Sequence, residues 1–282
     1  MIAHVAEASE LSGRVVLWLD PESQCSPDLL DAPVRLAAAF GAEIETIIVE
    51  QAAHLNGDVP MRSIGPASDT GAHLADHRFE LLSERSRRAV ERAGAAHRVQ
   101  VRHALAHGDA VDRIAEMCLE RGPWNIVALT RMPGLGSHSV IGSLLANVSG
   151  ATGFLLCNEH RPIAISARVV VVVEDADRLP SMLRAAERLS EPGSPVQIVI
   201  GAETAAEHAE LEQQVRLLTA EMSTVSFASV GPTFGVPGAL TEAVARMKPS
   251  LIVARFGGAA LADGRELSRA SAATRAPILL VR

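Results

Sequence analysis

The sequence predicts an α/β protein made of two tandem five-stranded parallel sheets with helices on both faces. Three observations support this class. Short apolar runs, typical of strands buried on both faces, alternate with amphipathic segments. The same order of runs occurs twice along the chain, and such alternation favours parallel sheets. Hydrophobic residues make up 48% of the 282 residues but aromatic residues only 3%, so an aliphatic core is expected.

The first copy begins with an apolar strand and an amphipathic helix. Residues 14–19 form the predicted strand, which ends at Asp20. Ser26, followed by a proline, is typical of a helix start, and Gly41 is typical of a helix end. Residues 43–49 form the second predicted strand.

A polar insertion, 51–70, follows the second strand and predicts a loop because it contains several glycines and prolines. The charged segment 71–95 then predicts a long helix, and 99–104 a third strand. Asp109 can cap the next helix, whose apolar positions recur at helical spacing until Gly122.

The most informative stretch is 124–157, which predicts a strand, a glycine-containing loop, a helix and a second strand. Gly134 and Gly136 in the loop permit a positive φ and a close approach of another group. Gly142 and Ser143 are expected near the start of the helix. Backbone N–H groups at such a helix start favour an anion, most often a phosphate.

The second copy follows a linker at 158–166. Its predicted strands are 168–173, 196–200, 224–229, 251–254 and 278–281, and its predicted helices include 179–189, 202–222 and 236–247. We therefore divide the chain into two domains, 1–160 and 161–282, of which only the first carries the long insertion.

Charge and cysteine content exclude several function classes. A net charge of −7 argues against a nucleic-acid surface, which needs clustered positive charge. Cys25, Cys118 and Cys157 fit neither a disulfide framework nor a zinc site, so reduced thiols are expected. The N-terminus has neither a basic nor an apolar signal region, and no apolar run reaches the ~20 residues of a membrane helix. A cytoplasmic protein with no membrane contact is expected.

Each half resembles a universal stress protein (UspA-type) domain, and the whole chain resembles a tandem member of that family. The resemblance depends on the strand that ends at Asp20, on the His107-Gly108-Asp109 turn and above all on 125–143. It implies a Rossmann-like, adenine nucleotide α-hydrolase-like fold with strand order 3-2-1-4-5 in each domain. It also implies a ligand crevice beyond the carboxyl ends of the strands.

The resemblance implies an adenine nucleotide, ATP or AMP, in the first domain. Nucleotide-binding members place an acid after the first strand and the end of the second strand beside adenosine, and a glycine-rich loop around the phosphates. The acid position falls on Asp20 and the second-strand position on Val49. Thr130 stands where the loop motif has its first glycine, whereas Gly142 and Ser143 match its closing pair. The full candidate set is Asp20, Val49, Thr130, Gly134, Gly136, Ser137, Gly142 and Ser143.

The second domain departs further from the family pattern. Its loop, 255–265, is about four residues shorter than the motif, and Arg265 replaces the serine or threonine. Asp263 would lie beside a phosphate and repel it. We therefore expect no nucleotide in the second domain, which would serve as an internal partner in a pseudo-dimer. A further homodimer is an open alternative.

No enzymatic activity is expected beyond a slow, incidental ATPase, because the sequence has no nucleophile elbow, Walker loop or zinc-protease motif. His73 and His77 have metal-binding spacing, but a solvated helix face explains them better. His103 and His107 are interpreted as structural, with His107 at the crevice as the alternative. The leading hypothesis is a stress-associated regulatory protein, and the alternative is an interaction module that binds no nucleotide. A pyrophosphatase-type enzyme of the wider fold group is a third hypothesis, which the missing loop after the first strand disfavours.

Overall fold

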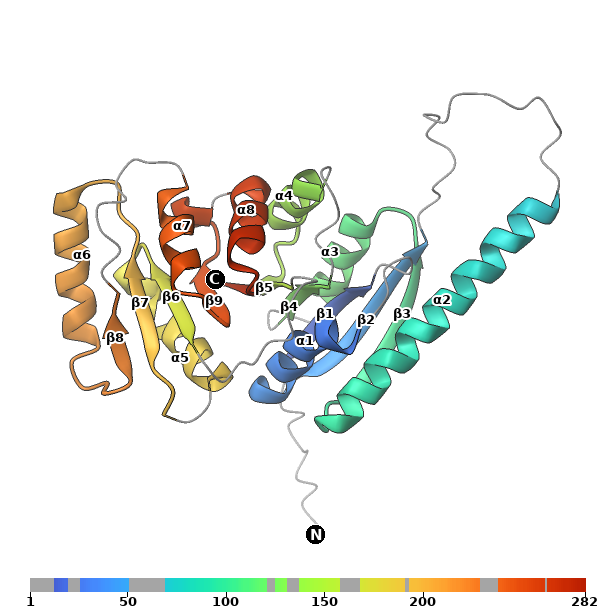
Figure 1. Ribbon diagram of the computed structural model, residues 1–282. Helices are drawn as coiled ribbons and strands as arrows, with labels where there is room; N and C mark the ends of the chain where they lie inside the picture. Colours follow the sequence, from blue (N-terminus) through green and yellow to red (C-terminus); the bar gives the residue numbers. More distant parts are fainter. Residues whose placement is uncertain are drawn as a thin grey trace, which may run out of the picture.

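The computed structural model describes residues 13–19, 26–50, 69–120, 125–130, 137–157, 168–190, 193–228, 238–261 and 263–282. The N-terminal half contains β1 (Arg14–Leu19), α1 (Pro27–Phe40), β2 (Glu43–Glu50), α2 (Asp69–Ala96), β3 (Val101–His107), α3 (Ala110–Glu120), β4 (Asn125–Leu129), α4 (Ser137–Asn147) and β5 (Ala151–Leu156). The C-terminal half contains β6 (Val169–Val173), α5 (Leu179–Leu189), β7 (Val196–Ile200), α6 (Ala205–Leu218), β8 (Val225–Phe227), α7 (Ala239–Arg246), β9 (Leu251–Arg255), α8 (Gly264–Thr274) and β10 (Ile278–Val281). Strand and helix alternate in both halves, as expected (Figure 1).

All ten strands form one continuous sheet in the order β3-β2-β1-β4-β5-β10-β9-β6-β7-β8. The α/β class with mostly parallel strands is confirmed, but the expectation of two separate five-stranded sheets is wrong. The order of the whole sheet therefore differs from 3-2-1-4-5. Within it, β3-β2-β1-β4-β5 and β8-β7-β6-β9-β10 each run in that sequence when the strands are counted from the start of their own half.

The two halves join because β5 pairs with β10 in antiparallel orientation. An outer strand otherwise leaves a row of backbone N–H and C=O groups without partners, and this pairing satisfies both outer strands at once. Gly153 allows the close approach, since a Cβ there would lie 2.7 Å from the Leu280 carbonyl oxygen. Because β5 and β10 are antiparallel, the strands of the two halves run in opposite directions. The carboxyl ends of the N-terminal strands and those of the C-terminal strands therefore lie at opposite ends of the sheet.

Helices cover both faces of the sheet, and each face is shared by the two halves. One face packs against α1, α2, α5 and α6, and the other against α3, α4, α7 and α8. The buried residues that mark the first face are Val34, Val90, Met182 and Val215, and those that mark the second are Ile114, Leu144, Val244 and Leu267. Across the junction α1 contacts α5 and α4 contacts α8, so the halves pack through helices as well as strands.

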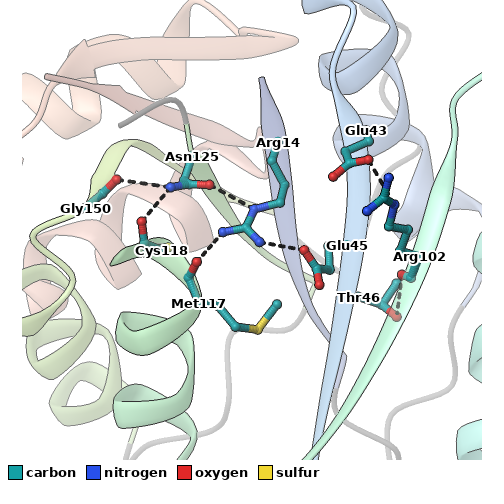
Figure 2. Close-up of polar contacts among 9 residues, drawn as sticks. All are labelled: Arg14, Glu43, Glu45, Thr46, Arg102, Met117, Cys118, Asn125 and Gly150. Carbon is teal, nitrogen blue, oxygen red and sulfur yellow. Dashed lines mark hydrogen bonds and ion pairs between the residues drawn. The ribbon is translucent and has the colours of Figure 1, made fainter. Parts of the chain in front are cut away.

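A buried polar cluster joins three strands to α3 at the amino ends of β1 and β4 (Figure 2). Arg14 donates from Nε to Asn125 Oδ1 at 2.9 Å, from Nη1 to Glu45 Oε2 at 2.5 Å, and from Nη2 to the Met117 carbonyl oxygen. Asn125 donates to the Cys118 carbonyl oxygen at 2.8 Å. Met117 and Cys118 lie in the last turn of α3, where carbonyl groups lack partners within the helix, so the cluster satisfies them.

Within the part of the chain that the structure describes, no helix combines the length and the apolar character that crossing a membrane requires.

Candidate functional site

The carboxyl ends of β1 and β4 mark the N-terminal crevice. β1 lies between β2 and β4 in the sheet. The helix that follows β1 covers one face of the sheet and the helix that follows β4 covers the other. Connections that leave in opposite directions create a crevice beyond the strand ends, where ligands of such folds bind. Leu19 and Thr130 are the last described residues on its two sides.

Val49 and Thr130 both lie at the ends of strands that border this crevice. Ile48 pairs with Leu19, so Val49 stands one residue beyond the described end of β1. Its side chain is buried in the core, which leaves only its backbone for a ligand. Thr130 is buried as well, and its hydroxyl donates to the Trp18 carbonyl oxygen at 3.3 Å. This hydrogen bond therefore connects the end of β4 to β1.

Gly142 and Ser143 lie inside α4 rather than at its first turn. The helix begins at Ser137, five residues before Gly142. Only the first four N–H groups of an α-helix lack partners within the helix. The N–H groups expected from the sequence near Gly142 and Ser143 therefore belong to the first turn, at Ser137. A Cβ on Gly142 would meet no described atom within 4 Å, and Ser143 is exposed.

The remaining candidates lie wholly or partly outside the described residues. Asp20, Gly134 and Gly136 fall in ranges that the structure does not describe, and for Ser137 only the backbone, as the start of α4, is described. Their grouping around a ligand therefore stays a prediction. Of the candidate set, the structure brings Val49 and Thr130 to the strand ends and places Gly142 and Ser143 farther along α4.

The C-terminal crevice is hollowed into a cavity of about 740 Å³ beyond the ends of β6, β7 and β9. Arg255 is the one cationic side chain among its described lining residues, and it donates to Asp175 at 3.1 Å. The cavity is otherwise acidic. The carboxylates that line it are Glu174, Asp175, Glu203, Glu207, Glu210 and Glu266.

Glu174 reaches across the C-terminal crevice to the loop after β9. It follows β6 as Asp20 follows β1. A Cβ on Gly258 would lie 1.9 Å from Glu174 Oε2, so the carboxylate lies directly against the backbone of Gly258 and would have to move to admit a side chain there. The loop after β9 is the one that the family resemblance assigns to phosphates. In this half a carboxylate of the chain itself occupies that place.

Asp263 occupies the second anion-binding position, the start of α8. As the N-cap residue, it accepts hydrogen bonds from the backbone N–H groups of Arg265 at 2.8 Å and Glu266 at 2.9 Å. The hydrogen bond from Glu266, followed by that from Arg265, holds the pKa of the Asp263 carboxyl below its usual value. These N–H groups would otherwise be available to a phosphate.

The lengths of the two loops correct a prediction from the sequence. α4 and α8 have the same length of 11 residues, and each is followed after three residues by its strand. Residues 130–136 precede α4 and 256–263 precede α8, so the C-terminal loop is the longer of the two. Gly142 therefore corresponds to Arg269, in the middle of α8, and not to Gly264. The Gly142-Ser143 pair was therefore not sufficient to align the first loop with the second.

The histidines and cysteines carry no catalytic arrangement among the residues that the structure describes. His103 lies 2.7 Å from Thr46 Oγ1 and 3.1 Å from Glu91 Oε1, as expected of a structural histidine. His107, at the end of β3, lines a cavity between α2 and β3, and its place at the crevice stays a prediction. Burial raises the pKa of Cys118 to about 11 and that of Cys157 to about 12, so both stay protonated thiols at neutral pH.

The described residues contain no group of three or more His, Cys, Asp or Glu side chains placed to hold a metal ion. His77 is exposed on α2, 3.9 Å from Glu80, and the side chain of His73 lies outside the described residues. Cys25 also lies outside them.

Sequence reasoning missed three features. The Arg14 cluster had one visible signal, a charged residue at the start of an otherwise apolar strand. The contact of Glu174 with Gly258 had none, because it joins residues far apart in the chain. The cavity between α2 and β3 also had none, since its polar residues belong to a helix that looks uniformly charged.

No family model matches the chain, and no curated protein matches it. Several solved structures do match the chain. A universal stress protein from Archaeoglobus fulgidus is similar at 15% identity, with 96% of this chain and 97% of that chain covered and a TM-score of 0.63. A putative universal stress protein from Pseudomonas aeruginosa shares 14% identity over 96% of this chain and 94% of that one, with a TM-score of 0.53.

The cytoplasmic domain of a prokaryotic cation chloride cotransporter is similar at 11% identity, with 95% of each chain covered and a TM-score of 0.51. At these identities the likeness establishes a shared fold. The chain has the fold of the universal stress protein structures over nearly its whole length.

Proposed function

We propose that this chain is a regulatory protein of the universal stress type that binds one adenine nucleotide, ATP or AMP, in its N-terminal crevice. The observation that carries the proposal is the asymmetry of the two crevices. In the C-terminal crevice the chain's own carboxylates, Glu174 and Asp263, occupy both positions that an anion would take. The C-terminal half then acts as an internal partner, and the domains 1–160 and 161–282 form a pseudo-dimer.

Electrostatics supports the exclusion of nucleotide from the C-terminal crevice. Like charges about 4 Å apart repel by roughly 4 kcal/mol at an effective dielectric constant of about 20. A triphosphate carries several negative charges, and six carboxylates against one arginine line this cavity. A polyanion would therefore have to displace two carboxylates and then remain beside the others.

In the N-terminal half the sequence positions that correspond to Glu174 and Asp263 are Asp20 and Gly136, so no carboxylate precedes the first turn of α4. The hydroxyl of Thr130 donates to the Trp18 carbonyl oxygen. The first turn of α4 offers N–H groups to a phosphate. The family resemblance assigns the adenosine part to Asp20 and the backbone of Val49.

Titration calorimetry with ATP on the full chain tests the proposal. We expect one nucleotide per chain. Ser137→Asp adds a carboxylate to the first turn of α4, as Asp263 does for α8, and should weaken ATP at least tenfold. Ala146→Asp adds the same charge near the other end of α4, where the side chain is exposed, and should change the affinity less than twofold. Two nucleotides per chain, or equal effects of the two variants, would contradict the site.

The second candidate is an interaction module that binds no nucleotide in either half. Glu174 and Asp263 favour it, because a crevice that already contains carboxylates keeps its shape without a ligand. If calorimetry detects no ATP binding to the folded chain, this candidate replaces the first. A homodimer and a cytoplasmic location stay predictions under both.

A further inference from the structure

The two outer edges of the ten-stranded sheet differ in how well they are protected. The sheet ends at β3 on one side and at β8 on the other. β8 has only three residues, and Arg216 lies over the ring of its Phe227 at 4.1 Å, whereas β3 has seven residues. A very short edge strand is one way in which proteins prevent further pairing, and β3 lacks this protection. The β3 edge is therefore better suited to accept another strand.

The backbone groups of alternate β3 residues point away from the sheet. Ile44 of β2 pairs with Val101, and its N–H donates to the Gln100 carbonyl oxygen at 2.8 Å. In a parallel ladder this pattern directs the even-numbered residues of β3 toward β2 and the odd-numbered ones outward. The outward N–H and C=O groups of Val101, His103 and Leu105 have no partner among the described residues. Such a row is a template for an added strand.

A cavity of about 630 Å³ lies beside this edge, between α2 and β3. Figure 1 shows α2 running beside β3. The two elements touch at the amino end of β3, where a Cβ on Gly94 would lie 2.5 Å from Val101. Farther along, Phe79 and Leu105 supply apolar lining, and Leu105 is 50% exposed. Because side chains directly opposite one another share a face of the sheet, alternate side chains of an added strand would point into this cavity.

Carboxylates lie at both ends of this part of α2. Glu80 lines the cavity toward the carboxyl end of β3, and Glu91 lies 3.1 Å from His103 nearer the amino end. Both carboxylate side chains are more than half exposed, and neither has an arginine or lysine partner among the described residues. Arg87 also lines the cavity, but its Nε is buried. The exposed charges at the two ends are therefore negative, which favours basic side chains on the added strand.

We propose that the β3 edge binds an extended segment of a partner protein, in which an apolar side chain is flanked at the second position on each side by a basic one. The backbone of the segment pairs with the outward groups of His103 and Leu105. Its apolar side chain packs against Phe79 and Leu105, and its basic side chains face Glu80 and Glu91. This edge is separate from the N-terminal crevice, because α2 and α4 cover opposite faces of the sheet.

The peptide acetyl-Arg-Thr-Leu-Thr-Arg-amide is the probe, and amide spectra of the full chain, labelled with ¹⁵N, locate it. We expect saturable shifts in α2 and β3, with an affinity that saturating ATP leaves unchanged. Hydrogen exchange should slow at the His103 and Leu105 amides, which gain an acceptor, and change less at Arg102 and Ala104, which already bond to β2. Shifts confined to other elements, or unchanged exchange at His103 and Leu105, would overturn the proposal.

Two control peptides separate the contributions of charge and backbone. Replacement of both arginines by glutamates should weaken binding at least tenfold, because Glu80 and Glu91 then repel the peptide. Methylation of the leucine and threonine nitrogens removes backbone donors and should also weaken binding at least tenfold. Equal affinities of the three peptides would refute the site.

One pair of variants tests the apolar contact. Leu105→Lys should weaken the probe at least tenfold, whereas Leu81→Lys, at another exposed leucine, should change the affinity less than twofold. Equal effects of the two variants would contradict the contact. A chain that dimerises without peptide and already protects the His103 and Leu105 amides would assign this edge to a second copy, and the proposal would fall.

Discussion

Replacing Arg14 by methionine should strongly destabilise the protein, because the guanidinium group that it removes is buried and bonded on three sides. Arg14 is 4% exposed and Glu45 is 13% exposed, so the pair is almost fully out of water. Methionine keeps much of the side-chain volume but donates no hydrogen bond. Glu45, the Asn125 side-chain oxygen and the Met117 carbonyl would each lose a donor (Figure 2).

The expected cost is about 3–5 kcal/mol, because removal of Arg14 takes the guanidinium group away from a largely buried carboxylate. At about 2–4 °C per kcal/mol for a chain of this size class, Tm should fall by roughly 6–20 °C. The double variant Arg14→Met, Glu45→Leu removes both charges and should recover a large part of the loss, since apolar replacements of buried pairs are often tolerated.

A neighbouring ion pair supplies the control. Arg102 contacts Glu43 at 3.1 Å, but Arg102 is 47% exposed (Figure 2). Arg102→Met should therefore cost no more than about 1 kcal/mol. Urea unfolding of the parent chain and the three variants, followed by circular dichroism, gives the free energies of unfolding. Equal losses for Arg14→Met and Arg102→Met would refute the reasoning, as would a double variant no more stable than Arg14→Met.

Three further predictions concern the helices and the thiols. Gly142→Ala should raise the free energy of unfolding by about 0.5–1 kcal/mol in thermal or urea unfolding, because the position is inside α4 and the added Cβ meets no described atom; a loss of stability would contradict this placement. Asp263 has a lowered pKa in the folded state, so its contribution to stability is present above the pKa of the unfolded chain and is lost as the pH falls through the folded-state pKa. In Asp263→Asn the urea midpoint should therefore decline less steeply as the pH is lowered. An unchanged slope would contradict the role of Asp263 as the helix cap. Burial raises the pKa of Cys118 to about 11 and that of Cys157 to about 12, so their contribution to stability is complete below the ordinary thiol pKa of 9.0 and is lost as the pH rises from there through the raised values. In Cys157→Ala the free energy of unfolding should therefore decline less steeply above pH 9. An equally steep decline would contradict the burial of this thiol.

Local patterns were enough to predict the elements of the fold. The apolar runs at β1 and β6 and the turn at Gly41 have local causes, so their predicted bounds agree closely with the observed ones. The long helix α2 was predicted from the same kind of pattern. The joining of the two sheets was not predicted, because β5 and β10 are far apart in the sequence and either apolar strand could equally have been an uncovered edge.

The candidate site was predictable only in part, for a related reason. The strand ends at Val49 and Thr130 follow from strand length, and the structure places both at the crevice. The register of Gly142 within α4 depends on where the helix starts, and helix starts depend on caps that a motif alignment does not contain. The contact between Glu174 and Gly258 depends on tertiary packing alone.

Mass spectrometry of the freshly purified, denatured protein tests the central claim most directly, because a tightly held nucleotide co-purifies with the folded chain. The crevice asymmetry predicts ATP or AMP at up to one molecule per chain, and loss of that nucleotide from Ser137→Asp but not from Ala146→Asp. Two nucleotides per chain would contradict the occupation of the C-terminal crevice by Glu174 and Asp263. A folded protein that carries no nucleotide and takes up none on addition of ATP would contradict the N-terminal site.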